Sequence, residues 1–221
     1  MVKGLLIDFG GTIDTDGLHW LRMFEMSYQS LGLPVTGLRD AYVYAERTLG
    51  NQNIIKPDFS FRNTLREKIH LQLEYLCMKA DADSLLDFCY SYVSDNIRNV
   101  SAPVLREISE QIPVALVSNF YGNMHTVLRE FAIDGCFTDV IESAVVGVRK
   151  PDPEIFRLGA ETLGLEPEDT VAVGDSPDKD IIPASKAGCH TVWLSGRGWS
   201  DAVTCQPERT ITTLSNLQSN L

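Results

Sequence analysis

The sequence lacks an excess of positive charge. Its 221 residues contain 19 Lys and Arg against 30 Asp and Glu, which leaves a formal net charge of −11. Nucleic acids and anionic membrane surfaces attract proteins through a positive field, so this balance argues against both as partners. An anionic small molecule remains compatible with it, because a bound metal ion and a single lysine reverse the field locally.

Cysteine pairs and long apolar runs are also missing. The cysteines are odd in number and form no C-x-x-C pair, lying at Cys77, Cys89, Cys136, Cys189 and Cys205. This pattern indicates free thiols in a reducing compartment rather than a disulfide framework. No apolar run approaches the roughly 20 residues that a membrane-spanning helix needs, and no signal peptide precedes the first apolar run. We therefore expect a cytoplasmic protein.

What the sequence does have is a globular composition, with 44% hydrophobic residues, and a regular alternation of two patterns. Apolar runs typical of buried strands lie at 2–8, 113–118, 138–142, 170–174 and 190–194, with a further candidate at 210–214. Helical patterns separate them, at 102–111, 122–132, 153–163 and 179–187. Strands alternating with helices predict an α/β fold whose parallel sheet is covered by helices on both faces.

Between the first two strands the periodicity is helical only. Helices are expected at 18–31, 37–49, 61–78 and 83–98; in the third of these, Leu65, Ile69 and Leu73 recur every four residues. We therefore predict a helical unit of residues 16–98, inserted into an α/β core formed by residues 1–15 and 99–221.

Polar side chains stand where the predicted strands end or just ahead of a helix. They are Asp8, Ser118, Asn119, Lys150, Asp175 and Asp180. Asp8 is followed by the glycine turn Gly10–Gly11–Thr12, which would expose backbone N–H groups beside the carboxylate. The carboxyl ends of the strands are where an open α/β sheet binds its ligands, so we expect these side chains to share one site.

In this order the motifs resemble the haloacid dehalogenase-like (HAD) hydrolase superfamily. The signature of that family is an Asp nucleophile in D-x-D-G-T, then a Ser or Thr after a strand, a Lys, and finally G-D-x-x-x-N/D. The resemblance covers the core and implies a Rossmann-like sheet. The helical insertion is similar to the family's C1 cap domain, which closes over the active site.

The resemblance also implies roles for individual residues. Asp8 would be the nucleophile, and Mg²⁺ would be held by Asp8, the backbone carbonyl of Gly10 and Asp175. Phosphate oxygens would be bound by the Ser118 hydroxyl, the Asn119 N–H and Lys150. Asp180 would support the metal's waters or Lys150.

One departure from the family pattern concerns proton transfer. The motif reads D-F-G-G-T, so Gly10 replaces the second Asp, which serves family phosphatases as general acid and base. The haloacid dehalogenases and phosphonatases of the superfamily also lack it. Three residues near the start of the insertion are candidates for a replacement proton donor: His19, Asp14 and Asp16.

Three functions are compatible with these residues. The leading one is Mg²⁺-dependent hydrolysis of a small phosphorylated metabolite through Asp8, with weakened acid–base catalysis. The second is hydrolysis of a C–halogen or C–P bond. GDSPDKD resembles a metal site, which disfavours a dehalogenase, and a phosphonatase needs a cap lysine, for which Lys56, Lys68 and Lys79 are candidates. The third is a catalytically weak homologue that binds a phosphometabolite or a partner protein.

Overall fold

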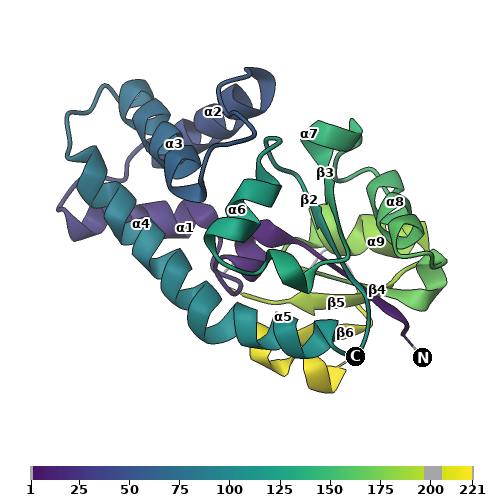
Figure 1. The fold of residues 1–221 in the computed structure, drawn as a ribbon. Helices are drawn as coiled ribbons and strands as arrows, with labels where there is room; N and C mark the ends of the chain where they lie inside the picture. The colour runs from purple at the N-terminus through teal and green to yellow at the C-terminus, as the bar shows by residue number, and fades with distance from the viewer. Residues whose placement is uncertain (1, 197–205, 221) are drawn as a thin grey trace.

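A six-stranded, entirely parallel sheet forms the centre of the molecule in a computed structural model that describes residues 2–196 and 206–220 (Figure 1). Its strands are β1 (Gly4–Ile7), β2 (Val114–Ser118), β3 (Asp139–Glu142), β4 (Thr170–Gly174), β5 (His190–Leu194) and β6 (Arg209–Ile211). The order across the sheet is β3-β2-β1-β4-β5-β6. The predicted α/β class and parallel sheet are confirmed, including the last strand candidate.

β1 lies in the middle of the sheet, and all four of its residues are buried. Ile7 pairs with Leu116 of β2 on one side and with Val173 of β4 on the other. Strands that are buried on both faces read as continuous apolar runs, as this one does. Because all three strands run in the same direction, their carboxyl ends open onto one edge of the sheet.

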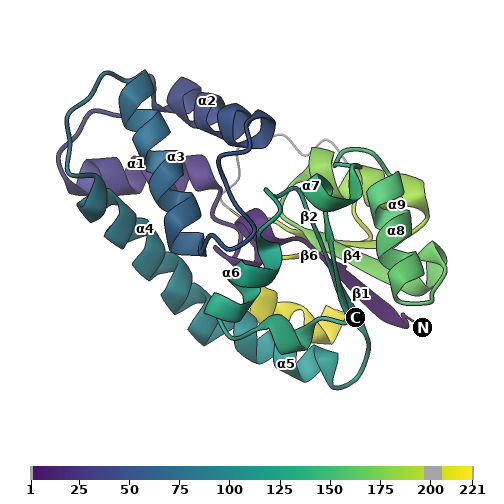
Figure 2. The ribbon, with the colours of Figure 1, turned by 45° about the horizontal axis from the view of Figure 1, so that its top comes forward.

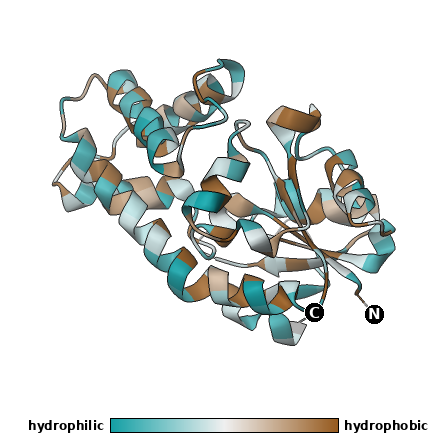
Figure 3. Cartoon of the chain, in the orientation of Figure 1, coloured by the Kyte–Doolittle hydropathy of each residue, from teal (hydrophilic) through white to brown (hydrophobic). Residues whose placement is uncertain are grey.

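Helices cover both faces of the sheet (Figures 1 and 2). Successive residues of a strand point to opposite faces, and accordingly Leu5 and Ile7 belong to one apolar cluster while Leu6 belongs to the other. The first face carries α5 (Ala102–Ser109) and α6 (Met124–Glu130), and the second carries α8 (Glu154–Thr162) and α9 (Ile182–Ala187). Figure 3 shows the apolar colouring along the strands between these layers.

Four helices are inserted between β1 and β2. They are α1 (Trp20–Ser30), α2 (Leu38–Asn51), α3 (Phe61–Tyr75) and α4 (Ala82–Asn96). Side-chain caps set three of their starts, at α1, α3 and α4. For α3, Ser60 accepts a hydrogen bond from the Asn63 N–H, and for α4, Asp81 accepts from the Ser84 N–H. In Figure 1 the four helices lie together on the left, beside the sheet. The bounds proposed for a separate cap, residues 16–98, stay a prediction.

Hydrogen bonds tie the inserted helices to the core at α6. The Asn123 side-chain amide donates to the Phe59 carbonyl and to the Thr64 hydroxyl, at 2.9 Å each. The Thr126 hydroxyl donates to the Pro57 carbonyl at 2.7 Å. These contacts fix the loop that leads into α3 against the region just after β2, and so set where the helices stand over the sheet.

Several helix ends differ from the expectation for local reasons. α1 begins at Trp20 because His19 Nδ1 caps it by accepting from the Leu21 N–H. α3 stops at Tyr75 rather than at 78, since the chain turns at Cys77 with φ of 48°. A short helix after β3, α7 (Ser143–Val146), was not predicted.

Two of the expected absences can be compared with the described residues. Cys77, Cys89, Cys136 and Cys189 carry free thiols, while Cys205 lies outside the described residues. In the described ranges, no helix combines the length and the apolar character that crossing a membrane requires.

Candidate active site

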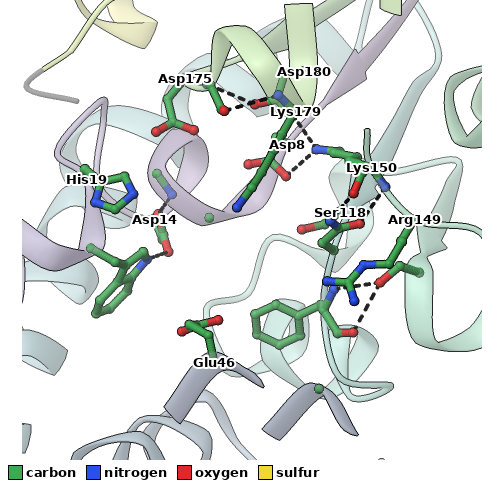
Figure 4. A pocket seen from close by; sticks show the side chains of 18 of the residues that line it. Asp8, Asp14, His19, Glu46, Ser118, Arg149, Lys150, Asp175, Lys179 and Asp180 are labelled. Carbon is green, nitrogen blue, oxygen red and sulfur yellow. Dashed lines mark hydrogen bonds and ion pairs between the residues drawn. The ribbon is translucent and has the colours of Figure 1, made fainter. Parts of the chain in front are cut away.

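The site is built at the carboxyl ends of three neighbouring strands. Asp8 directly follows β1, Ser118 ends β2 and Asp175 directly follows β4. The backbone N–H of Asp8 donates to the Val173 carbonyl at 3.0 Å, which extends the pairing of β1 with β4 up to the carboxylate. Figure 4 shows these side chains facing a common cavity.

Lys150 holds the centre of the site together. Its ammonium lies 2.6 Å from Asp8 Oδ1 and 2.6 Å from Asp180 Oδ1, and it is only 4% exposed. Burial alone would lower the pKa of Lys150, but the two carboxylates outweigh it and raise that pKa. Burial raises the pKa of Asp8 to about 6 against the opposing effect of Lys150. At neutral pH both groups are therefore charged, and Asp8 is an ionised nucleophile candidate.

Asn119 positions Lys150 through its side chain, a role that the sequence did not predict. Asn119 Nδ2 donates to the Lys150 carbonyl at 3.0 Å, and the Lys150 N–H donates back to Asn119 Oδ1 at 2.9 Å. This reciprocal pair joins the loop after β2 to the loop before α8. The Asn119 amide exchanges two hydrogen bonds with the Lys150 backbone, as a paired residue does in a β-sheet. Because a single side chain makes both bonds, no periodic pattern in the sequence predicts them.

Three carboxylates form a cluster that fits a hard divalent cation. Oxygens of Asp8, Asp175 and Asp180 all lie within 4.8 Å of one another. The Asp175 carboxylate accepts no hydrogen bond from the described part of the chain, and burial together with its acidic neighbours raises the pKa of Asp175 well above its usual range. A cation with oxygen ligands would relieve this repulsion. Asp180 Oδ2 accepts from the Ser176 N–H at 3.0 Å, so Asp180 is already held by the protein.

Gly10 and Gly11 differ in backbone conformation and in the space available for a side chain. Gly11 has φ of 90°, and a Cβ there would lie 2.4 Å from Asp175 Oδ2. Gly10 has φ of −78° and ψ of 114°, and no atom lies within 4 Å of where its Cβ would be. Gly11 is thus required by the backbone and by the approach of Asp175, whereas Gly10 is not required by sterics.

The structure brings two of the three candidate proton donors to the cavity. Asp14 is 1% exposed; its Oδ1 accepts from the Gly11 N–H at 2.6 Å and its Oδ2 from Trp20 Nε1 at 2.7 Å. Burial raises the pKa of Asp14 to about 7. Burial and the nearby Lys179 lower the pKa of His19, the second of the two, to about 4.

Asp16 is not brought to the cavity. Its Oδ1 accepts a hydrogen bond from the Leu214 N–H at 2.6 Å, which ties the start of the insertion to the C-terminal segment. It is absent from the residues that line the cavity, which include both Asp14 and His19.

A cavity of about 1500 Å³ lies above the strand ends and is roofed by the inserted helices. Lys68 of α3 lies 2.7 Å from the Glu46 carboxylate of α2, and the Tyr121 hydroxyl donates to that carboxylate at 2.6 Å. Of the three candidate cap lysines, Lys68 lines the cavity, while Lys56 and Lys79 are exposed elsewhere. Neither Glu46 nor Tyr121 lies in a sequence motif from which this contact could have been predicted.

Comparison with known proteins gives one consistent picture. A family model described as haloacid dehalogenase-like hydrolase matches residues 2–188. Phosphoserine phosphatase of Thermus thermophilus is 43% identical over 58 residues, which are 26% of this chain and 23% of that protein. Glyceraldehyde 3-phosphate phosphatase of Methanopyrus kandleri is 50% identical over 74 residues, 34% of this chain and 32% of that protein. The aligned stretches thus span only a quarter to a third of these relatives.

Solved structures resemble the chain over its whole length. A HAD hydrolase of Bacillus subtilis, YfnB, bound to magnesium, has a TM-score of 0.63 at 18% identity and covers 100% of this chain and 98% of its own. The L-2-haloacid dehalogenase of Xanthobacter autotrophicus, with chloropropionic acid covalently bound, has a TM-score of 0.63 at 15% identity, covering 99% and 98%. At these identities the likeness concerns the fold.

The contrast between the two glycines gives a matched pair of substitutions. We expect Gly11→Ala to destabilise the protein by about 1–3 kcal/mol, because it adds a side chain in a left-handed backbone and against Asp175. Gly10→Ala should change stability by less than about 1 kcal/mol. Urea unfolding of both variants measures this difference, and equal losses at the two positions would contradict it.

Proposed function

The chain belongs to the haloacid dehalogenase-like hydrolases, and we propose that it hydrolyses a small phosphorylated metabolite, with Asp8 as nucleophile and Mg²⁺ as cofactor. The observation that carries this proposal is the Lys150 ammonium, held 2.6 Å from Asp8 and next to the acidic cluster with Asp175. Phosphoryl transfer depends on positioning and on neutralising charge, and this arrangement supplies both. The phosphatases among the relatives support the same reaction class.

In the proposed reaction an Asp8 oxygen attacks phosphorus, and the bond from phosphorus to the leaving-group oxygen breaks. The resulting aspartyl-phosphate is then hydrolysed by water. Ser118, the Asn119 N–H and Lys150 would bind the phosphoryl oxygens, and Lys150 would neutralise the charge that develops on them. Mg²⁺, held by Asp8, the Gly10 carbonyl and Asp175, would add positive charge at the same place. Asp180 would keep Lys150 in position.

We propose that proton transfer to the leaving group is weak. No carboxylate stands at position 10, and His19, with a pKa near 4, carries a proton to donate only in acid. Asp14 is the better donor, because it lines the cavity and has a pKa near 7. Both of its oxygens already accept N–H hydrogen bonds, at 2.6 and 2.7 Å, and these favour the ionised form over the acid.

The other readings find less support in the site. A phosphonatase needs a neutral lysine to form a Schiff base, and Lys68 is the cap lysine in the right cavity. Its nitrogen already lies 2.7 Å from the Glu46 carboxylate, and this contact would have to break before the nitrogen could attack a carbonyl. A dehalogenase has no use for a cation site, which the acidic cluster fits. A cytoplasmic location remains part of the proposal.

Removing the nucleophile tests the function directly. We expect the wild-type protein with Mg²⁺ to hydrolyse members of a phosphoester panel that includes phosphoserine and glyceraldehyde 3-phosphate. Asp8→Asn should lower kcat at least about 10³-fold. Chelation should abolish the activity, and added Mg²⁺ should restore it. Asp16→Asn is the matched control, because it lies outside the cavity and should keep its rate. Turnover that survives Asp8→Asn would refute the proposed nucleophile.

Restoring the family's acid should raise the rate. Gly10→Asp places a carboxylate two residues after the nucleophile, and the negative φ and open space at Gly10 accept it without strain. General acid–base catalysis is typically worth about 10²–10⁴-fold, and the variant should gain a substantial part of that. Gly10→Asn is the control of equal size, with no acid. A folded Gly10→Asp protein with unchanged kcat on every phosphoester would argue against a phosphatase that lacks its acid.

The contribution of Asp14 depends on the leaving group. An alkoxide needs a proton in order to leave, whereas an aryl oxide leaves without one. Asp14→Asn should therefore lower kcat on alkyl phosphates by about tenfold or more and should affect aryl phosphates much less. His19→Asn, which keeps a helix cap, should affect the two substrate types equally. An equal loss on both types for Asp14→Asn would assign Asp14 a purely structural role, and melting temperatures should accompany the rates.

A further inference from the structure

The cavity has an inner layer and an outer layer with different charge. The inner layer holds Asp8, Lys150, Asp175 and Asp180, which together bind the phosphoryl group and its metal in the proposed function. The outer wall carries the further cations Arg47, Arg149 and Lys179. Figure 4 shows Lys179 beside Asp8 and Arg149 on the side of Ser118.

Within residues 2–196 and 206–220, these three exposed cations have no carboxylate at ion-pair distance. The ion pairs among the described residues include Lys150 with Asp8 and Asp180, and Lys68 with Glu46, but none that involves Arg47, Arg149 or Lys179. The chain has 30 acidic residues against 19 basic ones, so acidic partners are in surplus. Unpaired cations gathered around one cavity of an acidic protein indicate that their counter-charge comes from the ligand.

Lys179 and Arg149 act on side chains that line the cavity, where Glu46 opposes them. After burial, the Lys179 ammonium is the next cause of the lowered pKa of His19, and Glu46 opposes it. At Tyr121, burial and Glu46 raise the pKa of the hydroxyl, and Arg149 opposes them. Among the described residues, the Glu46 carboxylate is paired with Lys68, at 2.7 Å, and with the Tyr121 hydroxyl, at 2.6 Å, rather than with a cation of the outer wall. Asp178, exposed at the rim beside Lys179, is the remaining acidic group of this wall.

We infer that the leaving group of the substrate carries an anionic substituent of its own, a carboxylate or a second phosphate, which Lys179 and Arg149 bind. This inference relies on the proposed function for the place of the phosphoryl group. A neutral sugar or polyol would cover these cations without compensating their lost hydration, whereas an anion compensates it with charge-assisted hydrogen bonds. The wall therefore selects phosphorylated acids or bisphosphates over neutral phosphoesters.

Binding to the Asp8→Asn protein with Mg²⁺, measured by calorimetry, tests this without relying on turnover. Two pairs of ligands are compared. The affinity for 3-phosphoglycerate against that for glycerol 3-phosphate measures the preference for a carboxylate. The affinity for fructose 1,6-bisphosphate against that for fructose 6-phosphate measures the preference for a second phosphate. In at least one pair the anionic member should bind about tenfold more tightly. Lys179→Met and Arg149→Met should each reduce that ratio about threefold to tenfold. Lys186→Met, an exposed lysine of α9 outside the cavity, should leave it unchanged.

The outcomes separate this inference from the proposed function. No preference in either pair, no binding of any ligand, or a preference that both Met variants leave intact would overturn the inference. If the wild-type protein still hydrolyses phosphoesters in that case, the proposed function stands alone. A preference that falls with Lys179→Met and Arg149→Met, in a protein that hydrolyses none of these esters, would support the anionic subsite and refute the phosphatase.

Discussion

The site depends on one buried cation between two carboxylates. Lys150 comes from the loop before α8, yet its ammonium lies 2.6 Å from both Asp8 and Asp180, which follow β1 and β4. Without it, burial and repulsion by Asp180 would raise the pKa of Asp8 further, and an uncharged carboxyl group is a poor nucleophile. The Asn119 side chain, which pairs with both backbone groups of Lys150, fixes the loop that delivers this charge.

The turn after Asp8 contains two adjacent glycines that are under different steric constraints. Gly11 lets the backbone pass so close to Asp175 that no side chain fits between them. Gly10, its neighbour, occupies open space where a side chain would be tolerated. The approach of Asp175 therefore requires glycine at position 11, whereas sterics do not require glycine at position 10.

The inserted helices contribute to the site through contacts that start next to Asp8. Asp14 joins the turn after Asp8 to Trp20 at the beginning of α1, through hydrogen bonds on both of its oxygens. On the opposite side of the cavity, Tyr121 from the loop after β2 donates to Glu46 of α2. The roof is thus bonded to the core on both sides of the cavity, so its charged groups hold a defined position relative to Asp8.

The sequence by itself determined the parallel α/β sheet, the helical insertion and the residues that meet at the strand ends. These follow from apolar periodicity and from motifs in which each polar residue stands at a strand terminus, both of which are local properties. Only the tertiary structure decided that Asp14 faces the cavity while Asp16 binds the Leu214 N–H, although both stand in one short loop. It alone also revealed the Asn119–Lys150 pair and the Glu46–Lys68–Tyr121 contact. Their partners are distant in sequence, and which side chains meet across such a distance is fixed by how the helices pack, not by any pattern along the chain.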